Sequence, residues 1–164
     1  MKNLIIFLLI LSLIFILGCA QKNYTIIDKD LPAANILVFA AHQDDEIICA
    51  GGRMIKAMQN NKTVNVVIVT DGSPKEFNEN PVITNVRNNE TINALDKINI
   101  SKNNIIFLNV DDLGFIFDSN GNELVDKILG IISEKNPDEI YIPAYEGGHI
   151  DHDSVHVLVT KSLK

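Results

Sequence analysis

The sequence lacks the features by which proteins bind nucleic acids or depend on disulfide bonds. It contains no run of basic residues, and its net charge of −7 argues against a nucleic-acid-binding surface. It has only two cysteines. We expect no disulfide between them, because Cys19 belongs to an N-terminal signal and Cys49, among apolar neighbours, is expected to be a small buried residue. The fold must therefore depend on its hydrophobic core.

The sequence also lacks internal repeats beyond a strand–helix unit, low-complexity segments and any sign of a second domain. Its 164 residues are enough for one domain with a core. A glycine-rich phosphate-binding loop is absent as well, which disfavours phosphoryl transfer.

A hydrophobic run from Leu4 to Leu17, preceded by a lysine at position 2, is short for a spanning helix and typical of a signal peptide. It ends in Ile16-Leu17-Gly18-Cys19, which resembles a bacterial lipobox, in which the cysteine is lipidated and becomes the mature N-terminus. An uncleaved N-terminal anchor and an ordinary signal peptide are the alternatives. We expect an exported, membrane-anchored lipoprotein with a signal peptide at 1–19, a tether at 20–34 and one domain at 35–164.

Apolar strand-like segments alternate with helical patterns along this domain. We expect strands at 35–41, 63–70, 104–110 and 139–144, and helices at 46–60, 82–98, 123–134 and from 152 onward. The strands show no clean polar alternation, which predicts a mainly parallel sheet covered on both faces. The expected fold class is therefore α/β, a Rossmann-like three-layer sandwich, in which sites form at the carboxyl ends of the strands.

The apolar residues of the first two expected helices recur at helical spacing. In the first helix these are Ile47, Gly51, Met54, Ile55 and Met58. In the second helix, one face is expected to carry Val82, Val86, Ala94, Leu95 and Ile98.

Two clusters of histidines and acidic residues follow the first and the fourth expected strands. His42 and Asp45 are three residues apart, so a strand end that turns into a helix can direct both at one ion. Asp44 is then left for a different role. His149 and His152 in the second cluster have the same spacing. Three protein ligands with one open position are typical of catalytic metal sites, and nitrogen and oxygen ligands suit Zn²⁺ best, although Fe²⁺, Co²⁺ or Mn²⁺ could also bind.

Each cluster also has a purely structural interpretation. The acidic residues Asp44, Asp45 and Glu46 could favour the positive N-terminus of the following helix. Asp151 could be a helix N-cap. Two histidine-bearing clusters at matching ends of parallel strands favour the metal site.

The pair of clusters resembles the PIG-L/LmbE family of zinc-dependent N-acetylglucosaminyl deacetylases. The family motif Ala/Pro-His-Pro-Asp-Asp-Glu reads here Ala41-His42-Gln43-Asp44-Asp45-Glu46. Its second motif, Gly-Gly-His-Pro-Asp-His, reads Gly147-Gly148-His149-Ile150-Asp151-His152. Gln43 and Ile150 replace prolines, and because proline stiffens a turn, their presence is expected to loosen the placement of the ligands rather than abolish it.

The resemblance implies roles for the residues of both motifs. It makes His42, Asp45 and His152 the zinc ligands and Asp44 the general base. A bound metal lowers the pKa of a water molecule to about 7 and polarises the carbonyl of an amide, and a free carboxylate beside it can accept the proton.

The same resemblance implies that His149 stabilises the oxyanion and that Asp151 orients His149. The proton for the leaving amine would come from His149 or from Asp44. Arg87, in an Arg-x-x-Glu pattern of the second expected helix, would lie near the substrate pocket.

The implied function is hydrolytic removal of an acetyl group from an N-acetylglucosamine-type substrate by zinc-activated water. One alternative is an exported lipoprotein that binds a metal or a glycan without turnover. Another is an Mg²⁺ site for phosphoryl chemistry built from Asp44, Asp45 and Glu46, which the paired histidines disfavour. Family members usually continue beyond the position of Lys164, so we expect either a fragment or a domain with a minimal rim around its pocket.

Overall fold

The computed structural model describes residues 32–73, 81–111 and 121–164 of the chain. The expected signal peptide, Cys19 and most of the tether lie outside these residues, so the lipoprotein signal stays a prediction. In the described part, no helix is long and apolar enough to cross a membrane.

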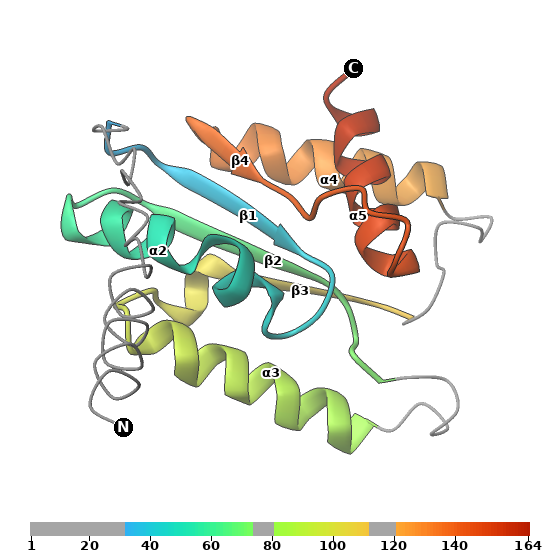
Figure 1. Ribbon diagram of the computed structural model, residues 1–164, viewed down its shortest axis with the longest axis horizontal. Helices are drawn as coiled ribbons and strands as arrows, with labels where there is room; N and C mark the ends of the chain where they lie inside the picture. The colour runs from blue at the N-terminus through green and yellow to red at the C-terminus, as the bar shows by residue number, and fades with distance from the viewer. Residues whose placement is uncertain (1–31, 74–80, 112–120) are drawn as a thin grey trace, which may run out of the picture. The chain divides into compact units, whose positions relative to one another are not determined.

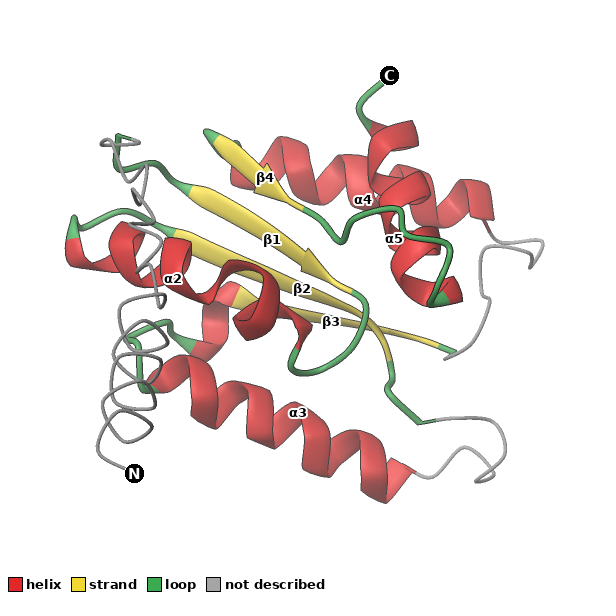
Figure 2. Cartoon of the chain, in the orientation of Figure 1, coloured by secondary structure: helices red, strands yellow, loops and turns green. Residues whose placement is uncertain are grey.

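The described residues form a parallel sheet between two layers of helices (Figures 1 and 2). The sheet has four strands in the order β3-β2-β1-β4. The strands are β1 (Ile36–Ala40), β2 (Val64–Thr70), β3 (Ile105–Val110) and β4 (Glu139–Tyr141). The helices are α2 (Asp45–Gln59), α3 (Pro81–Asp96), the short 3-10 helix η2 (Lys102–Asn104), α4 (Gly121–Lys135) and α5 (Ile150–Ser162). The predicted α/β three-layer fold is confirmed.

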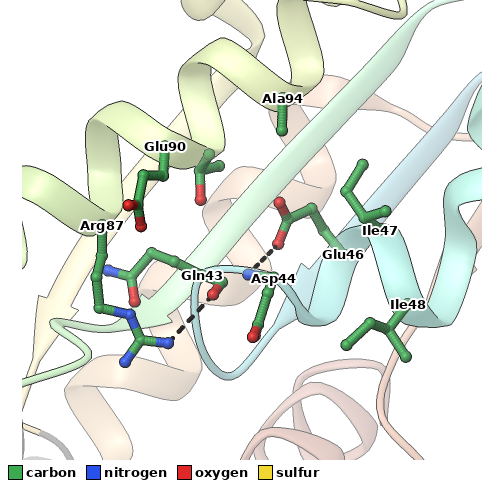
Figure 3. Close-up of a pocket in the computed structure, with 9 residues that line it drawn as sticks. Gln43, Asp44, Glu46, Ile47, Ile48, Arg87, Glu90 and Ala94 are labelled. Carbon is green, nitrogen blue, oxygen red and sulfur yellow. Dashed lines mark hydrogen bonds between the residues drawn. The ribbon is translucent and has the colours of Figure 1, made fainter.

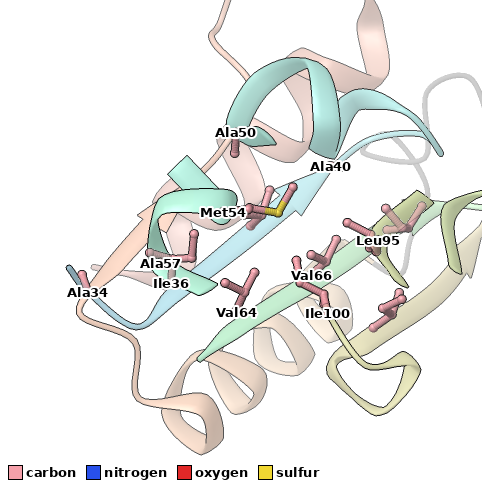
Figure 4. Packing of buried hydrophobic residues seen from close by; sticks show 13 residues of the cluster. Ala34, Ile36, Ala40, Ala50, Met54, Ala57, Val64, Val66, Leu95 and Ile100 are labelled. Atoms are coloured by element: carbon pink, nitrogen blue, oxygen red, sulfur yellow. The ribbon is translucent and has the colours of Figure 1, made fainter. Parts of the chain in front are cut away.

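Two hydrophobic clusters lie on the two faces of the sheet. On one face, Ile36 of β1 belongs to a cluster with Met54 of α2 and Leu95 of α3 (Figure 4). On the other face, Phe39 of β1 packs in the cluster that contains Val155 of α5. Because successive residues of a strand point to opposite faces, a sheet covered on both sides needs apolar residues at every position. This requirement explains the continuous apolar runs in the sequence.

Helix α2 buries a narrower face than its apolar spacing suggests. Met54 is fully buried together with Ala50 of the preceding turn, whereas Ile47 and Ile55 are about two-fifths exposed. The prediction that Cys49 is buried is wrong: its side chain is exposed, because the neighbouring Ala50 is the residue that faces the sheet.

The expected face of α3 is correct only at Leu95 and Ile98, because Ala94, which was expected on the same face, is exposed. Leu95 is fully buried, and Ile98 packs against the same cluster. Val82 and Val86 are 66% and 50% exposed, contrary to the prediction. The apolar contacts of α3 with the sheet come from its last turns and from the segment that follows.

Strand β4 is shorter than expected, ending at Tyr141 instead of Ala144. Pro143 follows it, and proline cannot donate a hydrogen bond to a neighbouring strand. β4 pairs with β1 in the register Ile36↔Glu139, and β2 pairs with the other side of β1. The carboxyl ends of β1 and β4 therefore lie at the same edge of the sheet.

An ion pair connects α2 with the edge strand β4. The guanidinium of Arg53 contacts both carboxylate oxygens of Glu139, at 2.6 Å from Nη2 and 3.0 Å from Nε. The hydroxyl of Tyr141 also donates to this carboxylate, at 2.9 Å. The hydrogen bonds from Arg53 keep the pKa of Glu139 below its ordinary value.

We predict that Glu139→Gln lowers the free energy of unfolding at pH 7 by about 1 kcal/mol, because a bidentate pair is lost. Since the pKa of Glu139 is depressed in the folded protein, the contribution is complete above the ordinary glutamate pKa and disappears as the pH falls through the folded value. Urea unfolding at pH 7 and at about pH 3 measures both effects. Glu134→Gln is the control, because the carboxylate of Glu134 is exposed and forms an ion pair with the adjacent Lys135. Equal stability of Glu139→Gln and the wild type at pH 7 would contradict the prediction.

Candidate metal centre

The loops that follow β1 and β4 bring three imidazole rings together. His42 lies two residues beyond the end of β1, while His149 and His152 lie at the start of α5. One nitrogen of each ring lies within 4.8 Å of the others. The rings of His149 and His152 are stacked, with centroids 4.8 Å apart. The sheet order thus joins two clusters that are more than a hundred residues apart in the sequence.

Asp45 completes a second, overlapping set of candidate ligands. Its Oδ2 atom lies 3.3 Å from Nδ1 of His42 and 3.2 Å from Nε2 of His152. Ligand atoms about 2.0–2.1 Å from a tetrahedral zinc ion are about 3.3 Å apart. The two distances from Asp45, and the mixture of nitrogen and oxygen atoms, therefore fit a zinc ion.

The remaining nitrogen of each of these two histidines contacts a carboxylate. Nε2 of His42 lies 3.2 Å from Oδ2 of Asp151, which is fully buried. Nδ1 of His152 lies 2.9 Å from Oε1 of Glu146. Carboxylates in this position fix the orientation of a metal-binding imidazole and increase its basicity. Glu146 had no signal in the sequence beyond its place just before the second motif.

Asp151 lies differently from its expected place. Its Oδ2 atom is 3.9 Å from Nδ1 of His149, farther than from His42, so its shorter side-chain contact is with His42. It is not the N-cap of α5 either. The N-cap is His149, whose Nδ1 accepts a hydrogen bond from the backbone N–H of Asp151 at 3.3 Å.

Asp44 has a backbone conformation that is rare for a residue with a side chain. Its φ is 127° and its ψ is −30°, and holding a non-glycine residue at positive φ costs about 1–3 kcal/mol. Asp44 occupies the N-cap position of α2, but its side chain makes no capping hydrogen bond. The side chain of Asp44 therefore does not cap α2, and its exposed carboxylate stays available for other contacts.

A pocket of about 460 Å³ lies between the start of α2 and helix α3 (Figure 3). Asp44, Ile47 and Ile48 line one side, and Arg87 and Glu90 line the other. Arg87, which was expected near a substrate pocket, lines this pocket. None of the candidate metal ligands, the three clustered histidines and Asp45, is among the described residues that line it.

Burial and hydrogen bonding act in opposite directions on the two carboxylates of the first turn of α2. Burial raises the pKa of Asp45, but hydrogen bonds from His42 and the charges of His152 and His42 outweigh it and leave the pKa below its ordinary value. Burial of Glu46, which is 1% exposed, raises its pKa, although the N–H of Asp44 acts in the opposite direction. The carboxylate of Asp45, which contacts the histidines, therefore favours its charged form.

A family model described as GlcNAc-PI de-N-acetylase, PIG-L, matches residues 37–163 of the chain. Several solved structures share the fold. The N,N'-diacetylchitobiose deacetylase from Pyrococcus horikoshii is 24% identical, with a TM-score of 0.67 over 79% of this chain and 49% of that protein. The A40926 pseudoaglycone deacetylase Dbv21 is 23% identical, with a TM-score of 0.63 over 80% of this chain and 59% of that protein.

The 4-carboxy-2-hydroxymuconate hydratase GalB from Pseudomonas putida KT2440 also has this fold, with 16% identity and a TM-score of 0.65 over 78% of this chain and 55% of that protein. The chain therefore spans about half to three-fifths of the length of these proteins. At these identities the likeness concerns the fold, which accommodates more than one reaction.

We predict that Asp45→Ala weakens zinc binding by more than about 100-fold. Even the loss of a residue that only hydrogen-bonds to a metal ligand lowers metal affinity by about 10–100-fold. His149→Ala should weaken it less than about tenfold. Competition with a chromogenic chelator measures both affinities. His156→Ala is the control, because Nδ1 of His156 contacts the backbone oxygen of Pro143 outside the cluster. The reverse order of effects would show that the three histidines, and not Asp45, hold the metal.

We also predict that the free energy of unfolding of Asp44→Gly is about 1 kcal/mol higher than that of Asp44→Ala. Glycine relieves the strain at φ 127°, and only part of this gain is offset by its greater entropy loss on folding. Chemical denaturation of both variants gives the difference. At Asp126, exposed within α4, the same pair of substitutions should show the opposite order, because glycine weakens a helix. If glycine were also the less stable residue at position 44, the strain would be disproved.

Proposed function

Because the chain belongs to the PIG-L family of GlcNAc-PI de-N-acetylases, we propose that it is a zinc-dependent hydrolase that removes an acetyl group from an N-acetylated amino sugar or its conjugate. The observation that carries the proposal is the convergence of His42, Asp45 and His152, next in the chain to Asp44, whose side chain makes no capping hydrogen bond.

The residues of the site divide the work between them. A bound zinc ion would act as a Lewis acid and lower the pKa of a water molecule to about 7. His42, Asp45 and His152 would hold the ion, with Asp151 and Glu146 orienting the two imidazoles. The carboxylate of Asp44 would accept the proton of the attacking water, which is the role of a general base.

His149 is suited to donate a hydrogen bond to the developing oxyanion. Its Nδ1 accepts the N–H of Asp151, so its hydrogen is carried by Nε2. A donor of this kind contributes about 3–4 kcal/mol to the stabilisation of the transition state. The amine must leave protonated, and Asp44, having taken the proton from water, or His149 would supply that proton.

The decisive test is the release of free amine from N-acetylglucosamine conjugates by the purified chain. We expect release that is lost on chelation and restored by zinc. Asp44→Ala should reduce kcat by at least about 100-fold, the usual contribution of a general base, while zinc affinity is preserved. Asp126→Ala is the matched control, an exposed aspartate on α4, and should leave kcat unchanged.

Two outcomes would contradict the proposal. Unchanged amine release by Asp44→Ala would exclude this residue as the base. A zinc-loaded chain that binds the conjugates but releases no amine would identify a binding protein without turnover.

A further inference from the structure

The peptide between Gln43 and Asp44 is bonded at both ends by charged side chains (Figure 3). Its carbonyl oxygen accepts a hydrogen bond from Nη2 of Arg87 at 3.1 Å. Its N–H, which belongs to Asp44, donates to Oε2 of Glu46 at 3.0 Å. The C=O and N–H of a planar trans peptide point in opposite directions, so the two bonds together fix the rotation of this peptide. That rotation determines the φ of Asp44.

Arg87 is itself held by the loop that follows β2. Its Nη1 donates to the backbone oxygen of Gly72 at 2.9 Å, so its guanidinium bridges the loops after β1 and β2. Gly72 has a φ of +64°, and a Cβ atom there would lie 3.0 Å from Nη1 of Arg87 and 2.1 Å from Oε1 of Gln43. The close approach of these side chains therefore requires glycine at position 72.

The side chain of Gln43 adds a third connection. Its Nε2 donates to Oδ1 of Asn88 at 2.8 Å and to the backbone oxygen of Asp71 at 3.2 Å. In this chain, hydrogen bonds from a glutamine hold the loop at the position where the family motif has a proline.

We propose that Arg87 and Glu46 are positioning residues that hold the Gln43–Asp44 peptide and thereby direct the carboxylate of Asp44. The catalytic part of this inference rests on the proposed function, whereas the fixed peptide does not. Released from either bond, the backbone of Asp44 would relax from its unfavourable φ, and its carboxylate would move relative to His42 and Asp45. Figure 3 shows this carboxylate directed away from Glu46. Arg87 thus acts through the backbone, instead of through direct contact with substrate.

Hydrogen exchange of the Asp44 amide, followed by NMR, tests the fixed peptide without any substrate. Glu46→Met removes the acceptor at similar side-chain length, and Arg87→Met removes the donor at the other end. We expect this amide to exchange at least about tenfold faster in both variants, because losing a hydrogen bond to a charged group changes such an equilibrium by that factor or more. The effect of Arg87→Met would be indirect, since Arg87 bonds the carbonyl of this peptide and not its amide. Glu46→Gln keeps an oxygen acceptor and should preserve most of the protection. Arg53→Met is the control. Arg53 lies farther along α2 and pairs with Glu139, so its loss should leave the exchange of the Asp44 amide unchanged.

Kinetics on an N-acetylglucosamine conjugate tests the consequence for catalysis. Arg87→Met and Glu46→Met should each lower kcat with little change in KM, and the double variant should be hardly slower than the single ones, since both act on one peptide. If Arg87→Met exchanged the Asp44 amide at the wild-type rate and had a raised KM, the proposal would be overturned. Arg87 would then be a substrate-binding residue. If the chain released no amine at all, the proposed function would fail while the exchange result would stand.

Discussion

A single carboxylate oxygen, Oδ2 of Asp45, joins the two halves of the site. It lies within 3.3 Å of a nitrogen of His42 and of a nitrogen of His152, which come from different loops. It also accepts the backbone N–H of His42 at 2.9 Å, and it stands in the first turn of α2, where the helix dipole favours a negative charge. Asp151 and Glu146 then orient the outer sides of the imidazoles. Carboxylates gathered so closely are stabilised by a divalent cation, whose charge exceeds any other in such a site.

The architecture was predictable because its physical cause is visible in the two central strands of the sheet, β1 and β2. A sheet buried on both faces requires apolar residues at all positions, and β1 and β2 are fully buried along their length. Which residues of a helix face the sheet was less predictable, because a few apolar positions do not define a single helix face. Val82 and Val86 lie on roughly the opposite side of α3 from the buried Leu95, since each residue turns the helix by about 100°, and both are exposed.

The candidate site was predictable to the extent that its chemistry resides in short motifs. The contacts between side chains were not, because they depend on distances that only the folded loops define. Asp151 contacts His42, over a hundred residues away in sequence, more closely than its neighbour His149. The bonds from Arg87 to two backbone oxygens could not be inferred either, because a backbone acceptor leaves no trace in the sequence.

The pairing of β1 with β4 has a consequence for how the chain folds. β1 and β2 are joined by a short crossover, whereas Asn35 and Asp138, at the starts of the paired β1 and β4, are separated by 103 positions. Closing the longer loop costs more entropy, and such contacts form slowly. During synthesis His42 and Asp45 emerge long before His152, so a metal ion bound by the three proposed ligands would meet only two of them until β4 has docked. On the proposed ligand set, full metal affinity would appear only once β4 has paired with β1.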